Sequence, residues 1–398
     1  MSKYLRKQCS AAFLLAGTAI GSGMISLPMV LAKWGIIGTC VMMLTLAAFT
    51  YLTALIRADL NLHTRSEASL KDAGEALGVP WVGRVGDAML QLLSFALLAA
   101  YLSAGSSVLC EALQQTVPKP VVMVGCSCAL VGFFLLASDI IVDVNKGLFI
   151  GLFGGLFFLV GVLFWQVPMK RLPPGEGGPS FQDWATLIPI LFTAFGFQGS
   201  VRSVTKFCQN DRHMIQRACL WGSMITALVY TTWTVAILIV TANTDGAFFQ
   251  RMLAGQATDV GELVRVLSQA TSATFVKRGI WCISSLAVLT SILGVGVALL
   301  DHFRSMKGIP VWGATLITVF TPTLVALLTP NAFIRILNIS GIILAIMAIL
   351  VPCTLDLRLR RIKPPPLHFS FVKRQWMVHA TLLCGVGICW LGFLELRP

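Results

Sequence analysis

Most of this chain consists of long stretches that contain no Asp, Glu, Lys or Arg. A helix needs about 20 apolar residues to cross the hydrocarbon layer of a bilayer, because that layer is about 30 Å thick. The sequence holds eleven such stretches: Gln8–Ala32, Trp34–Ile56, Ala88–Cys110, Pro120–Ser138, Gly147–Met169, Trp184–Val201, Ala218–Thr244, Gly279–Leu300, Gly308–Ile334, Ile336–Leu355 and Gln375–Leu394. They predict an all-α integral membrane protein with about eleven transmembrane helices, of which the ninth and tenth have the least certain boundary.

The charged residues set the expected topology. They make up only 12% of the chain, about half the share in soluble proteins, and Lys plus Arg number 30 against 17 Asp plus Glu. Lys and Arg collect in the cytoplasmic loops of membrane proteins. Two thirds of them lie on the inner side when the N-terminus is cytoplasmic. We therefore expect a cytoplasmic N-terminus and an outer C-terminus. The longest loops, Arg57–Asp87 and Asp245–Arg278, are too short for a conventional soluble domain, so function lies between the helices.

Glycine clusters interrupt two of the predicted helices. The first stretch contains Gly17, Gly21 and Gly23, and the sixth contains Gly196 and Gly199. Glycine costs about 1 kcal/mol relative to alanine inside a helix, so both helices are weak at these points. A single cluster is more simply explained by close packing of small residues. Two clusters in corresponding spans instead indicate the binding site of an inverted-repeat transporter.

A helix that breaks inside the membrane exposes backbone groups with opposite partial charges. The N–H groups at the start of one half-helix favour a carboxylate, and the C=O groups at the end of the other favour an ammonium group or a metal cation. A pair of such breaks therefore suits a zwitterion such as a free amino acid.

The residues around both breaks resemble a known family. The resemblance is carried by Ala16–Met24 with Leu27 and Pro28, by Ala100–Ser103, by Ile188–Val201 and by Thr290–Val295. These segments are similar to the hydroxy and aromatic amino acid permeases of the amino acid-polyamine-organocation superfamily, in particular the bacterial tyrosine-specific permeases. Arg202 stands where members typically have Pro, and Gln198 where they often have His.

The resemblance implies a fold, a function and a location. The fold is the LeuT type, with a first repeat over residues 1–169, an inverted second repeat over 170–355 and a basic loop with an eleventh span over 356–398. The function is the import of an aromatic amino acid with protons, tyrosine foremost and tryptophan or phenylalanine as alternatives, by alternating access. The location is the bacterial inner membrane. No cofactor is expected besides the coupling ion.

Candidate substrate contacts follow from the two breaks. The backbone of Gly21, Ser22 and Gly23 is expected to hold the carboxylate, and the carbonyls of Thr18, Ala19 and Ile20 the amine or a cation. Other candidates have an equally plain structural interpretation, as packing residues or as partners for the neighbouring backbone. These are Phe195 and Phe197 on either side of Gly196, the amide of Gln198, and Tyr101 in the middle of span three.

Two predictions remain open for the coupling ion, namely a proton and a sodium ion. Asp and Glu residues, including Glu111, Asp139, Asp143, Asp301 and Asp356, are all placed at the ends of spans, so no proton-carrying carboxylate is evident. Asp301 and His302 are the leading titratable candidates, although a solvated helix end is the simpler explanation for them. Thr290 and Ser291 resemble the hydroxyl pair that completes a sodium site in sodium-coupled relatives of the LeuT type, with Gly17 and Ile20 at the matching positions of span one.

Other function classes find less support. A membrane-embedded transferase could use Asp139 and Asp143 as a metal site, but no second acidic cluster completes it. A channel filter and a phosphate-binding Gly-x-x-x-x-Gly-Lys motif do not occur in the sequence. No basic segment with interleaved aromatic residues indicates nucleic acid. The sequence therefore predicts a transporter with no catalytic residue and no resident metal.

Overall fold

The computed structural model is helical throughout the part that it describes. It describes residues 3–21, 23–64, 69–136, 138–166, 172–173, 175, 179–271, 273–304, 306, 308–329, 332–362, 369 and 372–396. The helices are α1 (Lys3–Ala19), α2 (Gly23–Leu31), α3 (Gly35–Thr64), α4 (Leu70–Ala76), α5 (Pro80–Ala112), α6 (Lys119–Phe134), α7 (Ser138–Gln166), α8 (Phe181–Ala194), α9 (Val201–Phe207), α10 (Arg212–Thr244), α11 (Gly246–Leu253), α12 (Val260–Gln269), α13 (Thr274–Arg304), α14 (Val311–Leu328), α15 (Ala332–Ala345), α16 (Val351–Ile362) and α17 (Gln375–Glu395). Short 3-10 turns lie at Ala32–Trp34 (η1) and Phe197–Ser200 (η2), and a π-helical turn lies at Ile346–Leu350 (η3).

The chain is an all-helical, multi-pass membrane protein. Nine helical segments among the described residues are long and apolar enough to cross a membrane. Each of the eleven predicted stretches nevertheless carries a helix. The counts differ because the first stretch is broken after Ala19, because α2 continues through η1 into α3, and because α6 has only 16 residues.

Two predicted loops are largely helical, which corrects the expectation from the charges. Helix α3 continues past Arg57 to Thr64, and Arg57 is 8% exposed rather than solvated in a loop. The rest of that connection contains α4, whose N-terminus is closed by a capping box between Ser69 and Asp72. The second segment, 245–278, contains α11 and α12, and α13 begins at Thr274.

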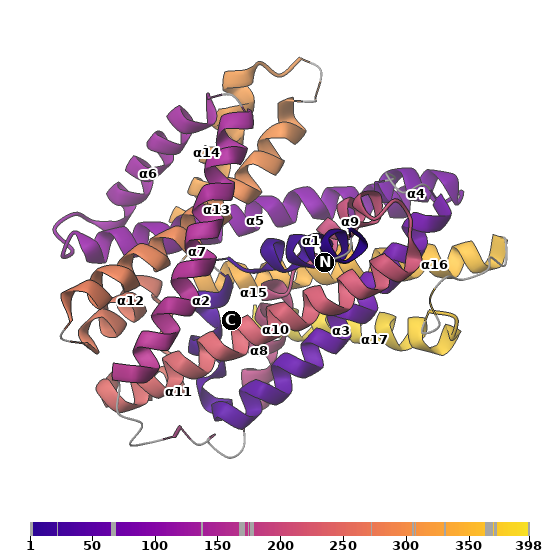
Figure 1. Ribbon diagram of the computed structural model, residues 1–398. Helices are drawn as coiled ribbons and strands as arrows, with labels where there is room; N and C mark the ends of the chain where they lie inside the picture. Colours follow the sequence, from indigo (N-terminus) through magenta and orange to yellow (C-terminus); the bar gives the residue numbers. More distant parts are fainter. Residues whose placement is uncertain are drawn as a thin grey trace.

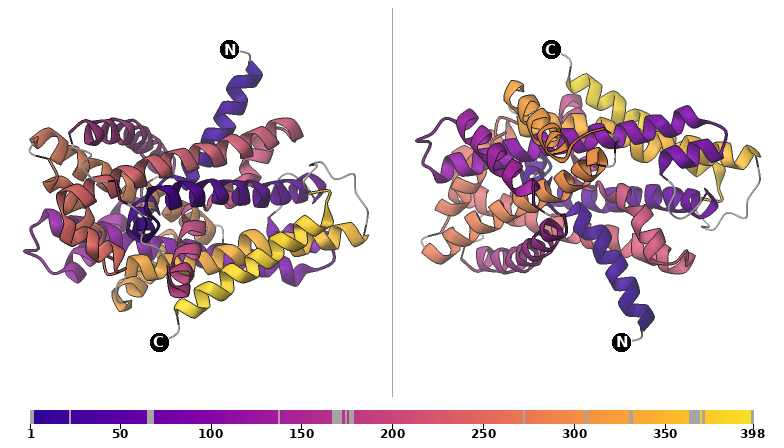
Figure 2. Two further views of the ribbon diagram at one scale, coloured as in Figure 1. Left: turned by 90° about the horizontal axis from the view of Figure 1, so that it is seen from below. Right: turned by 90° about the horizontal axis from the view of Figure 1, so that it is seen from above.

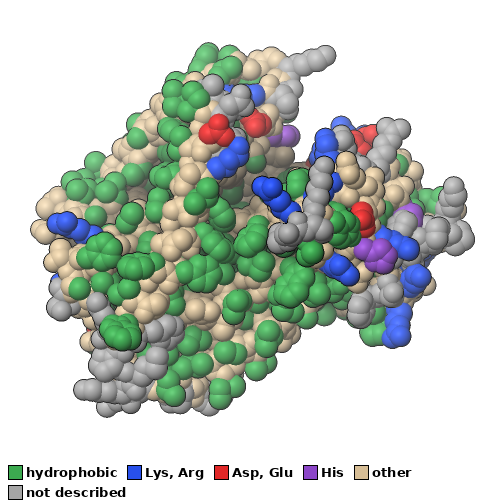
Figure 3. Space-filling model, viewed as in Figure 1, with side chains coloured by type: hydrophobic (Ala, Val, Ile, Leu, Met, Phe, Trp, Pro, Cys, Tyr) green, Lys and Arg blue, Asp and Glu red, His purple; other side chains and the backbone are tan. Residues whose placement is uncertain are grey.

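Three helices from segments that are predicted to be cytoplasmic share one end of the molecule. Figure 1 shows α4, α9 and α16 towards one end and α11 and α12 at the other. In the space-filling view, apolar side chains cover much of the long flank, and Lys, Arg and His side chains gather over the end that holds α4 and α16 (Figure 3). Which side of the membrane this end faces stays a prediction from the Lys and Arg count.

Long helices pack side by side around the two interrupted ones. Helix α10 packs along α3 and α1, while α15 packs against α5 and α8, and α17 lies beside α8 and α15 (Figure 2). The contact between α15 and α8 is close at Gly341, where a Cβ would collide with the backbone carbonyl of Pro189. This contact fixes the half of span six that leads into its break.

Gly341→Val should therefore destabilise the protein by about 1 to 3 kcal/mol through overpacking. Thermal denaturation of the purified protein measures the effect. Gly387→Val on α17 is the matched control, because a Cβ at Gly387 meets no atom within 4 Å. Equal melting temperatures of the two variants would contradict the close contact.

Asp259 anchors the segment that contains α11 and α12 to α5 and α6. It caps α12 by accepting hydrogen bonds from the backbone N–H groups of Gly261 (2.8 Å) and Glu262 (3.2 Å). Its carboxylate also pairs with Lys119 at 3.1 Å and accepts a bond from the Ser107 hydroxyl. Burial raises the pKa of Asp259, but Lys119 and these hydrogen bonds outweigh it, so the net pKa lies below its ordinary value.

Because this pKa is lower in the folded protein, the stabilisation is present above the ordinary carboxyl range and is lost as the pH falls through the folded value. Asp259→Asn should remove part of the acid sensitivity, and Asp259→Ala should cost about 1 kcal/mol at neutral pH through loss of the cap. Melting curves recorded from neutral to acidic pH measure both effects. A wild-type curve that matches Asp259→Asn at every pH would refute the assignment.

Candidate functional site

The first helix is interrupted where its glycines predicted. Helix α1 ends at Ala19, the chain leaves the helix at Ile20 and Gly21, and α2 begins at Gly23. The Ile20 N–H still bonds to Ala16, and the Met24 N–H bonds to the Gly21 carbonyl at 3.1 Å. Ser22, a predicted carboxylate ligand, lies outside the described residues. The expected interruption of span one is confirmed.

The sixth span is interrupted as well. Helix α8 ends at Ala194, Phe195 and Gly196 are not helical, and the chain resumes as η2 and α9. The Gly196 N–H bonds to the Thr193 carbonyl at 3.0 Å. The Thr193 hydroxyl lies 3.1 Å from the Leu337 carbonyl, which links this end of α8 to α15. The prediction of a second break at Gly196 is confirmed.

The two breaks lie against each other. A Cβ at Gly23 would lie 3.5 Å from the Ala194 Cα, so the start of α2 touches the end of α8. The hydroxyl of Tyr230, on α10, lies 2.6 Å from the Ala19 carbonyl oxygen and 2.9 Å from that of Ala194. One fully buried phenol thus bridges the C-terminal ends of both first half-helices. One turn further on, the Trp233 indole donates to the Met24 carbonyl at 3.1 Å.

Tyr230 was missed in the sequence although a signal for it existed. It is one of four tyrosines and lies in the middle of span seven, away from the interfaces where Tyr normally concentrates. The predicted site includes Tyr101, which is also in the middle of a span, but not Tyr230. Tyr101 is half-buried on α5 and packs against the main core cluster.

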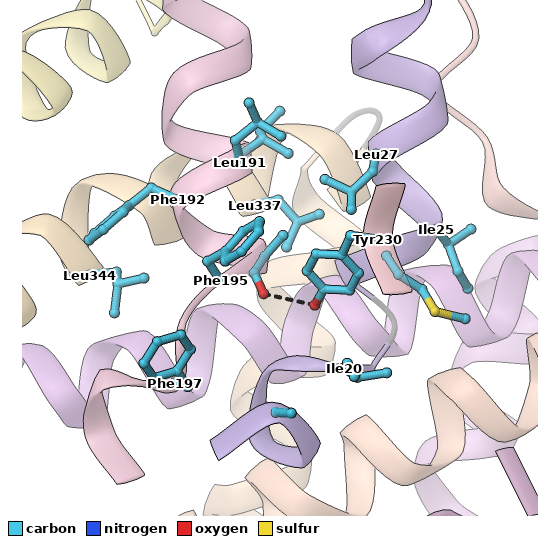
Figure 4. Packing of buried hydrophobic residues seen from close by; sticks show 14 of the residues in the cluster. Ile20, Ile25, Leu27, Leu191, Phe192, Phe195, Phe197, Tyr230, Leu337 and Leu344 are labelled. Atoms are coloured by element: carbon cyan, nitrogen blue, oxygen red, sulfur yellow. Dashed lines mark hydrogen bonds between the residues drawn. The ribbon is translucent and has the colours of Figure 1, made fainter. Parts of the chain in front are cut away.

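The aromatic candidates differ in their surroundings. Phe195 meets the Tyr230 ring edge-on, with ring centroids 5.3 Å apart. Figure 4 shows Phe197 farther from Tyr230 than Phe195 is, and near Leu344. Both phenylalanines are fully buried. Gln198 is also buried, and its amide donates to the Thr53 hydroxyl at 3.4 Å, which joins η2 to α3.

The hydroxyl pair of span eight lies against the first break. A Cβ at Gly21 would collide with the Ser291 Oγ, so α13 touches the backbone of the break. Thr290 is buried beside it, and each hydroxyl also donates to a carbonyl one turn earlier in α13. Gly17 faces the Phe149 ring of α7.

The acidic residues depart from the expectation that all lie at solvated span ends. Asp356 is fully buried in α16 and pairs with Arg360 at 2.6 Å. Asp59, which was assigned to a loop, is fully buried in α3 beside His63, 3.5 Å away. Asp301, the predicted titratable candidate, is instead exposed. Sequence spacing alone could not show this, because α3 and α16 extend beyond the uncharged stretches.

Cavities lie on both sides of the breaks. The larger one, of 330 Å³ and on the predicted outer side, is lined by α2, α8 and α15 and contains the Lys33–Asp183 ion pair, with N and O 2.6 Å apart. The smaller one, of 70 Å³ and on the predicted inner side, is lined by Gln198 and Gly199 of η2 together with parts of α3, α5, α9 and α16. Of these two, the larger approaches the size of pockets that hold small-molecule ligands.

The positions of Asp143 and the other described acidic residues do not support the alternative of a metal-dependent transferase. The Asp143 carboxylate is exposed and pairs with Lys146 at 2.8 Å, while the Asp139 side chain lies outside the description. Among the described residues, no group of three His, Cys, Asp or Glu side chains is placed to hold a metal ion.

Comparison with known proteins decides the family. The family model described as "Tryptophan/tyrosine permease family" matches residues 5–391. The chain belongs to the tryptophan/tyrosine permease family. Its members are transporters rather than enzymes, which agrees with a site built from backbone breaks.

Individual relatives cover nearly the whole chain. The "Tyrosine-specific transport system 1" of Haemophilus influenzae is 27% identical over 95% of this chain and 94% of its own length. The "Tryptophan-specific transport protein" of Pseudomonas aeruginosa is 29% identical over 94% and 91%. In structure, the chain is similar to a manganese transporter of Eremococcus coleocola, with a TM-score of 0.58, 14% identity and coverage of 97% and 85%. This likeness shows that the permease shares the fold of that transporter.

Tyr230→Phe tests the bridge between the breaks. The variant keeps the ring and removes the hydroxyl that lies within hydrogen-bond distance of both carbonyls, so we expect a loss of about 1 to 3 kcal/mol in stability. Amide hydrogen exchange should rise at Ile20, Met24 and Phe195.

Tyr51→Phe is the matched control, because its hydroxyl joins α3 to α10 through Gln216, at 3.2 Å, away from the breaks. If both variants raised exchange equally at the breaks, the specific role of Tyr230 would be wrong.

Proposed function

We propose that this permease is a secondary active transporter that imports aromatic amino acids by alternating access. Tyrosine is the first candidate substrate, and tryptophan and phenylalanine follow. The observation that carries the proposal is the meeting of two interrupted helices at Tyr230. The names of the relatives from Haemophilus influenzae and Pseudomonas aeruginosa support an aromatic substrate.

In this proposal the backbone provides the polar part of the substrate site. The N–H groups at Gly21–Gly23 face the amino acid carboxylate, and the carbonyls of Thr18–Ile20 face its ammonium group. Phe195 supplies an aromatic surface next to the break, and Phe197, Gly196, Gln198 and Tyr101 are further candidates. The 330 Å³ outer cavity then serves as the approach to this site.

The membrane arrangement is part of the proposal. Eleven spans, grouped as repeats over residues 1–169 and 170–355 with a final span in 356–398, fit the helix order and the two equivalent breaks. A cytoplasmic N-terminus and an outer C-terminus in a bacterial inner membrane place α4 and α16 on the inner side.

Proton symport is the proposed coupling, with sodium as the alternative. The contact of Ser291 with Gly21 favours the sodium alternative, because hydroxyl and carbonyl oxygens are the ligands that hard cations prefer. Gly17, Ile20 and Thr290 would complete that site. Asp301 is a weaker proton candidate because it is exposed, whereas Asp59 and Asp356 are buried carboxylates within spans.

Purified permease in proteoliposomes should exchange internal tyrosine for labelled external tyrosine without any gradient. An imposed proton gradient should then drive concentrative uptake, and a sodium gradient should do so if the hydroxyl pair is the coupling site. Labelled tryptophan and phenylalanine give the order of preference. Absence of exchange for all three amino acids would refute the proposed function.

Gly21→Leu should abolish exchange, because the added side chain meets the Ser291 side chain at the break. Gly161→Leu on α7 is the control, since a Cβ there meets nothing within 4 Å. Both variants should insert into membranes at wild-type levels. Normal exchange by Gly21→Leu would refute the backbone site.

A further inference from the structure

The inner pocket contains an arginine in an unusual setting. Arg57 lies in the last third of the 30-residue helix α3 and is 8% exposed. Its Nη1 is buried and has no hydrogen-bond partner among the described residues. A guanidinium remains charged at any physiological pH, and removing it from water is costly unless a counter-charge or acceptor faces it. Buried polar groups without a partner are rare and call for an explanation such as a bound ion.

The lining of the pocket has an excess of positive charge. Arg57 and Arg202 contribute two guanidinium groups, and Asp87 contributes one carboxylate. Asp87 forms no ion pair within 4.0 Å with either arginine, although its charge acts on Arg57 through space. The Gln198 side chain, 2% exposed, completes the polar lining. Arg202 is exposed to solvent, so the unmet need in this lining is an acceptor for the buried Nη1 of Arg57.

The size of the pocket limits the ligand. A water molecule needs roughly 10 to 15 Å³ of such space, so a pocket of 70 Å³ holds a small ion with a few waters. An aromatic amino acid does not fit. Phosphate-like dianions would overcompensate the single excess charge.

We propose that this pocket is a binding site for a small monovalent anion, with chloride as the probe. The anion would accept from the Arg57 guanidinium and face Arg202. It would join α3, α5, α9 and the turn η3 at the predicted cytoplasmic side of the second break. The site is independent of which amino acid the permease carries.

Chloride titration of the purified full-length protein tests the site. Thermal denaturation is recorded in sodium chloride and in sodium gluconate at equal ionic strength, because a ligand that binds only the folded state raises the melting temperature with its concentration. The wild type should be stabilised by chloride and not by gluconate. Arg57→Gln should lose this dependence, while Arg84→Gln, an exposed arginine on α5, should keep it.

A second variant keeps the test decisive if Arg57→Gln does not fold. Asp87→Asn removes the competing negative charge, so it should reach half of the chloride effect at a several-fold lower concentration than the wild type. Bromide soaked into crystals should give an anomalous peak beside the Arg57 guanidinium. Equal melting in chloride and gluconate, or an Asp87→Asn midpoint that is unchanged or higher, would overturn the proposal.

Discussion

The backbone of the two interrupted helices sets the constraint on which the rest of the structure depends. Inside a bilayer, a peptide group without a hydrogen bond costs several kcal/mol, so a helix breaks only where other groups satisfy the backbone it exposes. Here the partners come from α10. Tyr230 meets the carbonyls of Ala19 and Ala194, and Trp233 meets that of Met24. Helix α10 therefore stabilises both breaks through these hydrogen bonds.

The packing around the breaks follows from the same constraint. Helix α10 lies along α1 and α3, which places its buried aromatic side chains against the break. Helix α15 packs closely against α8 at Gly341, and the Ser291 side chain of α13 packs closely against Gly21. Each contact requires a residue without a side chain at the point of closest approach. The glycines thus serve both of the roles that the sequence left as alternatives, breaking the helix and allowing close packing.

Sequence patterns predicted the parts of this structure that local chemistry determines. Uncharged stretches located the helices, and the clusters at Gly17–Gly23 and Gly196–Gly199 located the breaks. Features that depend on the meeting of distant segments were not predicted. Tyr230 is 36 residues from Ala194 and 211 from Ala19. The uncharged stretches place Arg57, Asp59 and Asp356 in loops or at span ends, because a charged residue ends each stretch, whereas the helices continue past these residues and bury them.

The arrangement at Tyr230 also bears on how a charged substrate is accommodated. A hydroxyl has one proton, so at any moment it donates to one of the two carbonyls and leaves the other with unused acceptor capacity. Both carbonyls belong to C-terminal helix ends, which carry partial negative charge. An ammonium group arriving there brings three donors and relieves this shortage. In the proposed function, a substrate amine is bound here without a buried carboxylate, and Tyr230 alone satisfies part of the break after the amine leaves.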